Sequence, residues 1–177
     1  MIKDNPMVLS LGILTISDRS ARGEREDASG PLLADIVRSK GWKVVYQDIV
    51  PDDFRLIKTT LIAWCDSKEV DVILTSGGTG FSPRDITPEA TQAVLERVAP
   101  GLAEAMRAFS LRATPHAMLS RATAGIRGRT LIVNLPGSPK AARENLAVIL
   151  PILPHAVQLL SEDPNAEAGH STQLSGI

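Results

Sequence analysis

The sequence predicts an α/β fold, a three-layer single domain in which a mostly parallel central sheet has helices on both faces. Two observations support this prediction. Apolar runs of strand length, rich in Leu and β-branched residues, alternate in the first half of the chain with segments whose apolar residues recur at helical spacing. Alternation of this kind is typical of parallel strands joined by right-handed crossovers, whose helices cover both sides of the sheet.

Three strands and two helices are expected in the first half of the chain. Residues 7–17 (MVLSLGILTIS) form an apolar, β-branched run that indicates a buried strand. After a polar stretch, 32–41 has helical apolar spacing and closes on a glycine. Residues 42–50 indicate a second strand, and 52–67 opens on acidic residues suited to a helix N-terminus. The almost wholly apolar segment 70–75 predicts a third strand, covered on both faces.

The second half has a less regular pattern. Residues 87–98 predict a helix with Pro88 in its first turn, and 101–113 predict another. Within 119–135 we expect two short strands around a glycine. Residues 138–160 indicate a long closing helix, and two prolines inside it predict a kink or break.

Composition and length bound the class of protein. At 177 residues the chain fits one domain, which we place at 7–160 between a lead (1–6) and a tail (161–177). Lys plus Arg number 19 and Asp plus Glu 20, so no overall basic field favours nucleic acid. The single Cys65 excludes an internal disulfide, and we expect it to be a buried core residue. With no signal segment and no apolar run near the ~18 residues of a membrane span, we expect a cytoplasmic protein that does not bind membranes.

The most informative loop follows the third strand and reads TSGGTGFSPRDITPEA. Gly77, Gly78 and Gly80 allow backbone amides to approach an anion, at the sheet edge where open α/β folds bind ligands. The loop lacks the Gly-Lys-Ser/Thr ending of a P-loop, and the third glycine of a dinucleotide fingerprint is replaced by Pro83. Taken alone, the glycines fit a structural turn as well as a phosphate loop.

Charged residues near this loop favour a phosphate ligand with a metal ion. Arg84 is suited to bidentate phosphate binding, whereas Asp85 would repel phosphate unless a cation lay between them. Mg²⁺ is usually held by one or two carboxylates together with phosphate oxygens. Asp52, after the second strand, is a second candidate. The alternative is that Asp85 anchors a turn or caps a helix, and that Asp52 caps the helix that follows it.

Six segments, in chain order, resemble the molybdopterin adenylyltransferases, namely the bacterial MogA type and the G domains of plant and animal molybdenum cofactor proteins. They are ILTISDRSARGEREDASGP, VPDD, TSGGTGFSPRDITPEAT, PGLAEAMR, MLSRATAGIRG and LIVNLPGSPKAARE. The resemblance extends from Val8 to about Leu160 and implies a MoaB/Mog-like fold, usually a homotrimer. It also implies Mg²⁺, with ATP and molybdopterin as substrates, transfer of AMP to the terminal phosphate of the pterin with loss of pyrophosphate, and a possible hand-off to a molybdenum insertase.

Carried over residue by residue, the resemblance makes Asp52 and Asp85 the catalytic and metal-binding carboxylates. For Ser29 and Ser138, helix capping is an equally open interpretation. The residues assigned to ligand binding, in addition to Arg84, are Ser17, Asp18, Asp27, Ser29, Gly30, Thr75, Gly77, Gly78, Thr79, Gly80, Ser120, Arg121, Asn134, Pro136, Gly137 and Ser138.

The histidines, His116, His155 and His170, form no recognisable triad, and we expect His116 to be structural. Adenylyl transfer does not require a triad, because a phosphate monoester has a second pKa of about 6 and arrives ionised. Two other interpretations remain. One is a non-catalytic, trimeric molybdopterin-binding or scaffold protein of the same fold, and the other is a different small nucleotide-binding α/β protein.

Overall fold

The computed structural model describes residues 7–162, so the predicted lead and residues 163–177 of the predicted tail, with His170, lie outside the described residues. The middle layer is a six-stranded sheet. Its strands are β1 (Ser10–Ile16), β2 (Lys43–Val50), β3 (Val72–Ser76), β4 (Arg97–Val98), β5 (Ala124–Arg127) and β6 (Thr130–Leu135). Their order is β2-β1-β3-β6-β5-β4, in which the first four strands run parallel, β5 is antiparallel to β6, and β4 is antiparallel to β5. The mostly parallel sheet is therefore confirmed.

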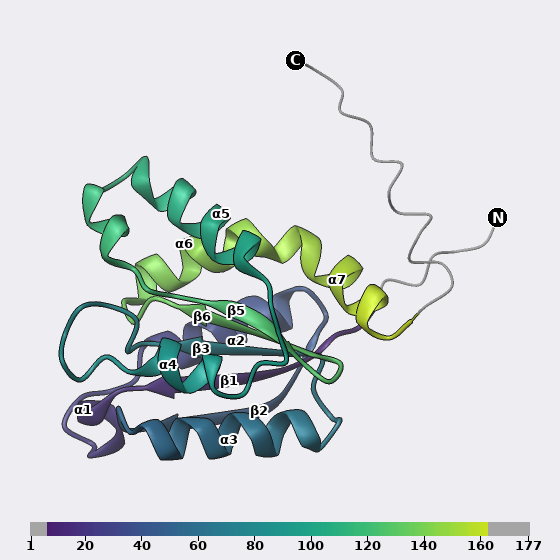
Figure 1. Cartoon of the computed structure of the whole chain (residues 1–177), viewed down its shortest axis with the longest axis horizontal. Coiled ribbons are helices and arrows are strands. Elements are labelled where there is room, and N and C mark those ends of the chain that lie inside the picture. Colours follow the sequence, from purple (N-terminus) through teal and green to yellow (C-terminus); the bar gives the residue numbers. More distant parts are fainter. Residues whose placement is uncertain (1–6, 163–177) are drawn as a thin grey trace.

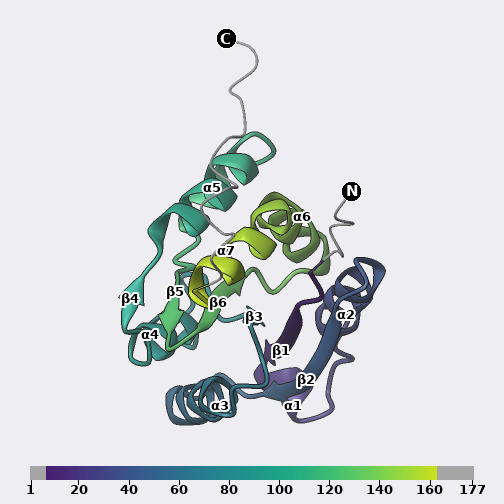
Figure 2. The same ribbon diagram turned by 90° about the vertical axis from the view of Figure 1, so that its right-hand side faces the viewer.

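Helices cover both faces of this sheet, which confirms the three-layer architecture (Figures 1 and 2). The helices are α1 (Asp18–Ala21), α2 (Ser29–Ser39), α3 (Phe54–Asp66), α4 (Thr87–Gln92), α5 (Pro100–Leu111), α6 (Pro139–Ile149) and α7 (Leu153–Leu160), with 3₁₀ turns η1 (Pro115–Leu119) and η2 (Leu150–Ile152). Helices α2, α5, α6 and α7 pack on one face, and α3 and α4 pack on the other. No helix within residues 7–162 has the length and apolar character needed to span a membrane.

Two apolar layers form because neighbouring strand residues point to opposite faces of the sheet. Ile13 joins the layer beneath α2, α5, α6 and α7, whereas the next residue, Leu14, joins the layer above α3 and α4. Strand β3 is buried along its whole length because it lies between both layers. Cys65 is 7% exposed and belongs to the second layer, as expected for a core residue.

The predicted helix 87–98 is wrong in its second half. Helix α4 ends at Gln92, and the chain then forms β4 at the edge of the sheet. The amides of Glu96 and Ala99 donate to carbonyls of Ile126 and Ala124, at 2.9 and 2.8 Å. These bonds satisfy backbone groups of β5 that would otherwise form an open sheet edge, so tertiary pairing overrides the local helical pattern.

Other differences are small. The closing helix is broken as predicted, since η2 with Pro151 separates α6 from α7. Helix α2 begins three residues earlier than the predicted 32–41, at Ser29. The short segments α1 and η1 were not predicted, because a single turn leaves too little periodicity to recognise.

Candidate active site

The loops that follow β1, β2, β3 and β6 meet at the carboxyl edge of the sheet, where all four parallel strands end. Together with residues before α2 they line a cavity of about 290 Å³, which we call the carboxylate cavity. The sequence-predicted residues in its lining are Ser17, Asp27, Ser29, Asp52, Gly77, Gly78, Asp85, Gly137 and Ser138.

A glycine turn directly after β3 forms part of this lining. Gly77 and Gly78 both have positive φ, 108° and 63°, a conformation that favours glycine. A Cβ atom on Gly77 would stand 2.2 Å from the carbonyl oxygen of Ile16, and one on Gly78 would stand 2.3 Å from Oγ1 of Thr87. Side chains are therefore excluded at both positions, and the turn packs closely against the end of β1.

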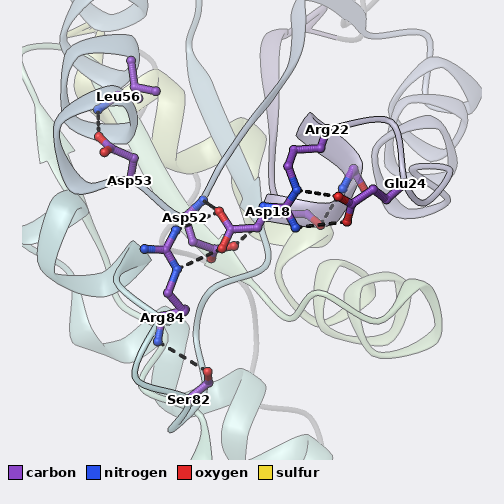
Figure 3. Close-up of polar contacts among 10 residues, drawn as sticks. Asp18, Arg22, Glu24, Asp52, Asp53, Leu56, Ser82 and Arg84 are labelled. Carbon is purple, nitrogen blue, oxygen red and sulfur yellow. Dashed lines mark hydrogen bonds and ion pairs between the residues drawn. The ribbon is translucent and has the colours of Figure 1, made fainter.

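Reciprocal hydrogen bonds between Asp18 and Asp52 link the segments that follow β1 and β2 (Figure 3). The amide of Asp18 donates to Oδ2 of Asp52, and the amide of Asp52 donates to Oδ1 of Asp18, each at 3.0 Å. Arg84 donates through Nε and Nη2 to the two carboxylate oxygens of Asp18, at 2.9 and 2.8 Å. Arg84, predicted as a phosphate donor, is thus paired with Asp18, and neither residue lines the carboxylate cavity.

The two aspartates differ in acidity. Burial raises the pKa of Asp52, and the nearby charges of Asp18 and Asp85 raise it further, against hydrogen bonding from the Asp18 amide. The hydrogen bonds from Arg84 lower the pKa of Asp18. Helix α3 is capped by Asp53, whose carboxylate accepts from the amide of Leu56 at 2.8 Å, so the interpretation of Asp52 as the cap is wrong.

Arg121 holds the loop that carries Asp85. It donates through Nε to the carbonyl oxygen of Gly80 and through Nη2 to that of Asp85, both at 2.7 Å, and it pairs with Glu89. Asp85 accepts from the amide of Ser82 at 3.0 Å, so it anchors a turn while its side chain also lines the carboxylate cavity. The guanidinium of Arg121, predicted to bind ligand, therefore contacts the loop that forms the cavity.

Asp27 organises the start of α2 beside the carboxylate cavity. It accepts from Oγ1 of Thr15 at 2.7 Å, from the amide and hydroxyl of Ser29 at 3.0 and 3.1 Å, and from the amide of Gly30 at 3.0 Å. The N-cap of α2 is Ala28, so the capping interpretation of Ser29 is wrong. Gly30 packs against this carboxylate and does not line the cavity.

Two predicted site residues lie in the interior. Asn134 is fully buried and donates through Nδ2 to Oγ1 of Thr75 and of Thr91, each at 2.9 Å, so it links β6 to β3 and α4. Asn134 and Thr75 do not line the carboxylate cavity. By contrast, Ser17 and Ser138 line the carboxylate cavity and also cap α1 and α6.

The glycine loop continues into a second cavity of about 280 Å³, which we call the neighbouring cavity. Four predicted residues line it, namely Thr79, Gly80, Ser120 and Pro136. Six further residues that line this cavity were not assigned to ligand binding from the sequence, and one of them, His116, was expected to be structural. The six are Arg107, Ser110, Thr114, His116, Leu119 and Asn145. The segments PGLAEAMR and MLSRATAGIRG, recognised as family motifs, contain Arg107 and Leu119, and they were the signals available for this set.

Thr15 in β1 and Ser76 in β3 also line the carboxylate cavity and were missed, as were three further polar residues: Ser20, Arg25 and Glu26. These three belong to the polar stretch between β1 and α2. Alternating acidic and basic residues in such a stretch usually indicate a solvated loop, so the sequence held no specific signal for them.

The carboxylate cavity contains two carboxylates that could hold a magnesium ion together with substrate oxygens. Asp52 and Asp85 come from different loops, and Oδ1 of each accepts no hydrogen bond from residues 7–162. Within the same residues, no group of three or more His, Cys, Asp or Glu could hold a metal alone. Two carboxylates with free oxygens therefore suit Mg²⁺, which takes its other ligands from water and phosphate.

Comparisons with known proteins agree on one family. The family model described as a probable molybdopterin binding domain matches residues 12–155. The chain is similar to the molybdopterin biosynthesis enzyme MoaB of Thermus thermophilus, with a TM-score of 0.83, 51% identity, and coverage of 89% of this chain and 99% of that one. The Helicobacter pylori molybdopterin adenylyltransferase is 43% identical over 86% of this chain and 88% of its own length.

A longer relative shows the same match over part of its length. Gephyrin of Dictyostelium discoideum is 43% identical over 91% of this chain, but the chain spans only 24% of gephyrin. The family model covers most of the present chain, including the loops that line both cavities. The chain therefore belongs to the family of molybdopterin-binding domains found in molybdenum cofactor biosynthesis proteins.

Proposed function

We propose that the chain is a molybdopterin adenylyltransferase, which transfers AMP from ATP to the terminal phosphate of molybdopterin and releases pyrophosphate. The observation that carries the proposal is the pair of cavities along one glycine loop, with carboxylates in the lining of only one of them. A transfer between two phosphorylated substrates needs two adjoining sites that meet where the phosphates react. Relatives that bear this enzyme name, at 40–43% identity, support the proposal.

Asp52 and Asp85 would hold Mg²⁺ in the carboxylate cavity. When bound, the ion neutralises charge on phosphate oxygens and orients them for in-line displacement. The chain itself supplies the glycine turn at Gly77 and Gly78, where phosphate can approach the backbone closely. It also supplies rigidity, because Arg121 and the Asp18–Asp52 hydrogen bonds fix the loops that carry the two carboxylates.

The proposed reaction does not require a general base from the protein. The attacking phosphate of the pterin has a second pKa of about 6 and is largely ionised at neutral pH. Catalysis then consists of placing the phosphates and stabilising the charge that develops. His116, in the neighbouring cavity, lies within 3.2 Å of the hydroxyl of Thr114 and is not needed for proton transfer.

A pyrophosphate-release assay tests the proposal directly. Purified full-length chain is mixed with ATP, Mg²⁺ and molybdopterin, and pyrophosphate and adenylylated pterin are measured together. We expect the two products in equal amounts. Binding of molybdopterin without pyrophosphate release would instead support the non-catalytic, scaffold interpretation.

We further propose that the chain is a homotrimer. Exposed apolar side chains gather around β4 and the closing helices, and Val98, Ile152 and Leu159 are 69%, 48% and 46% exposed. Patches of this kind usually mark protein interfaces. Light scattering at micromolar concentration is expected to give a trimer, and Ile152→Asp is expected to lower the mass. A monomeric mass for the unmodified chain would contradict the proposal.

The product is a nucleotide-activated pterin, so a later enzyme must consume it. We propose hand-off to a molybdenum insertase, in the cytoplasm. Gephyrin supports this proposal because most of its length lies outside the region that matches this chain, so it has room for a further domain.

A further inference from the structure

The proposed reaction concentrates negative charge in the carboxylate cavity, and Arg84, the arginine predicted to bind phosphate, is not placed to neutralise it. The carboxylate cavity is lined by four acidic residues, Glu26, Asp27, Asp52 and Asp85. A pyrophosphate leaving group adds further negative charge to the same space. Arg84 does not line this cavity, and the Nε–Nη2 edge of its guanidinium is already occupied by the two carboxylate oxygens of Asp18. A cation that is not already paired would serve the leaving group better.

Arg25 is such a cation. It is the only basic residue among the described residues that line the carboxylate cavity. It lies in the exposed segment between α1 and α2, and within residues 7–162 it makes no ion pair or side-chain hydrogen bond. Arg22, three positions earlier, pairs with Glu24 through Nε and Nη2 at 2.7 and 3.0 Å (Figure 3). The same loop therefore holds one paired arginine outside the cavity lining and one unpaired arginine within it.

We propose that Arg25 binds the β- and γ-phosphates of the nucleotide and the pyrophosphate that leaves. This inference rests on the proposed function and assigns a residue to its leaving-group site. In the reaction, the bond between the α-phosphorus and the bridging oxygen breaks, and its electron pair stays on that oxygen. The new bond joins the α-phosphorus to an oxygen of the pterin phosphate. No proton passes through Arg25, whose guanidinium donates two parallel hydrogen bonds to the phosphate oxygens.

The position of Arg25 in the lining supports this assignment. The same cavity contains Gly77 and Gly78, where backbone can approach phosphate, and the two carboxylates suited to Mg²⁺. Arg25 thus adds an unpaired, charged donor to a space whose other walls are held by hydrogen bonds. Arginine is favoured for this task because its planar fork matches two phosphate oxygens at once.

Equilibrium binding of pyrophosphate tests the proposal, with Mg²⁺ present and the full-length chain in the calorimeter. Arg25→Ala is expected to weaken pyrophosphate binding by about 10-fold to 100-fold, the range for loss of charge-assisted hydrogen bonds. Arg25→Lys is expected to restore only part of the affinity, since a point charge cannot bind bidentately. AMP, which lacks the two outer phosphates, is expected to bind all forms within about twofold.

Arg22→Ala is the matched control, because it removes the same charge from the same loop at a paired residue. Its pyrophosphate affinity is expected to stay within about threefold of the unmodified chain. Equal losses of pyrophosphate affinity in Arg22→Ala and Arg25→Ala would overturn the proposal, since they would show that only the overall positive charge of the loop matters. Unchanged pyrophosphate affinity in Arg25→Ala, or no measurable binding to the unmodified chain, would overturn it too. Pyrophosphate release by the unmodified chain would still stand as the separate test of the proposed function.

Discussion

The carboxylate cavity and the neighbouring cavity have almost the same volume, about 290 and 280 Å³, but opposite electrostatic character. Four carboxylates and Arg25 line the first. Of the described residues that line the second, none is acidic, and its basic residue Arg107 is held by the carbonyl oxygens of Ser120 and Ala122, at 3.3 and 2.9 Å. The lining also includes apolar groups such as Leu119 and Pro136.

This difference indicates how one loop can serve two ligands. Gly77 and Gly78 line the carboxylate cavity, and the next two residues, Thr79 and Gly80, line the neighbouring one. A metal with phosphates suits the charged side, whereas a ring system suits the side with apolar walls. We therefore expect substitutions in the first cavity to change phosphate binding and transfer, and those in the second to change binding of the pterin.

The largest effect is expected for Asp85→Asn. Loss of this carboxylate removes a predicted metal ligand but keeps a side chain that can accept from the amide of Ser82. Turnover should fall by at least ~100-fold, the scale for loss of one electrostatic stabiliser, while the fold survives. Steady-state pyrophosphate release at saturating Mg²⁺ measures this change.

Asp53→Asn is the control for that substitution, since Asp53 caps α3 and asparagine is an equally good cap. It should retain nearly full turnover. A wild-type rate in Asp85→Asn would show that the carboxylate serves only as a turn anchor. The proposal that carboxylates in the first cavity hold a metal ion for transfer would then be wrong.

Leu119→Glu tests the other side of the comparison. Leu119 lines the neighbouring cavity, and a carboxylate there would repel the negative groups of molybdopterin. Pterin affinity is expected to fall about tenfold, on the order of 1.4 kcal/mol, while pyrophosphate affinity stays unchanged. Fluorescence titration with each ligand separates the two effects.

Met118→Glu is the matched control, because Met118 is adjacent in sequence, 66% exposed and absent from the cavity lining. It should bind both ligands normally. If Leu119→Glu weakened pyrophosphate binding and spared the pterin, the assignment of the two cavities would have to be reversed.

Much of the fold could be predicted because its signals are local. Strand β3 has apolar residues on both faces, and Pro151 breaks the closing helix at the expected place. The error at β4 arose because that segment pairs with β5, which lies far along the chain: Arg97 pairs with Ile126 and Val98 with Gly125. No property of residues 87–98 alone reveals that pairing.

The site shows the same division between local and long-range information. Asp52, Gly77, Gly78 and Asp85 line one cavity because they follow parallel strands whose carboxyl ends meet at one edge of the sheet, as the strand order expected from the sequence allows. Motif spacing could not show that Arg84 pairs with Asp18, 66 residues earlier in the chain. The loop around Arg25 gave no signal either, because only the fold turns it toward the cavity.

The smallest expected effect concerns the stability of the folded chain. It tests whether the ionised side chain of Asp52, in the carboxylate cavity, lowers that stability. Burial raises the pKa of Asp52 in the folded chain, so the ionised side chain destabilises the fold at pH values above that raised pKa. As pH falls through the raised pKa, the folded state binds the proton and this cost disappears. Asp52→Asn carries no charge at any pH and can still accept from the amide of Asp18.

In metal-free buffer, Asp52→Asn should therefore melt slightly above the unmodified chain at neutral pH, by under about 1 kcal/mol or roughly 2–4 °C. The difference should shrink as the solution is acidified. Added Mg²⁺ should stabilise the unmodified chain and not the variant, because only the former keeps both predicted ligands. Thermal melts at several pH values, with and without Mg²⁺, measure all three trends. A variant that is less stable at neutral pH would mean that Asp52 supports the fold rather than strains it, and that its charge serves structure rather than metal binding.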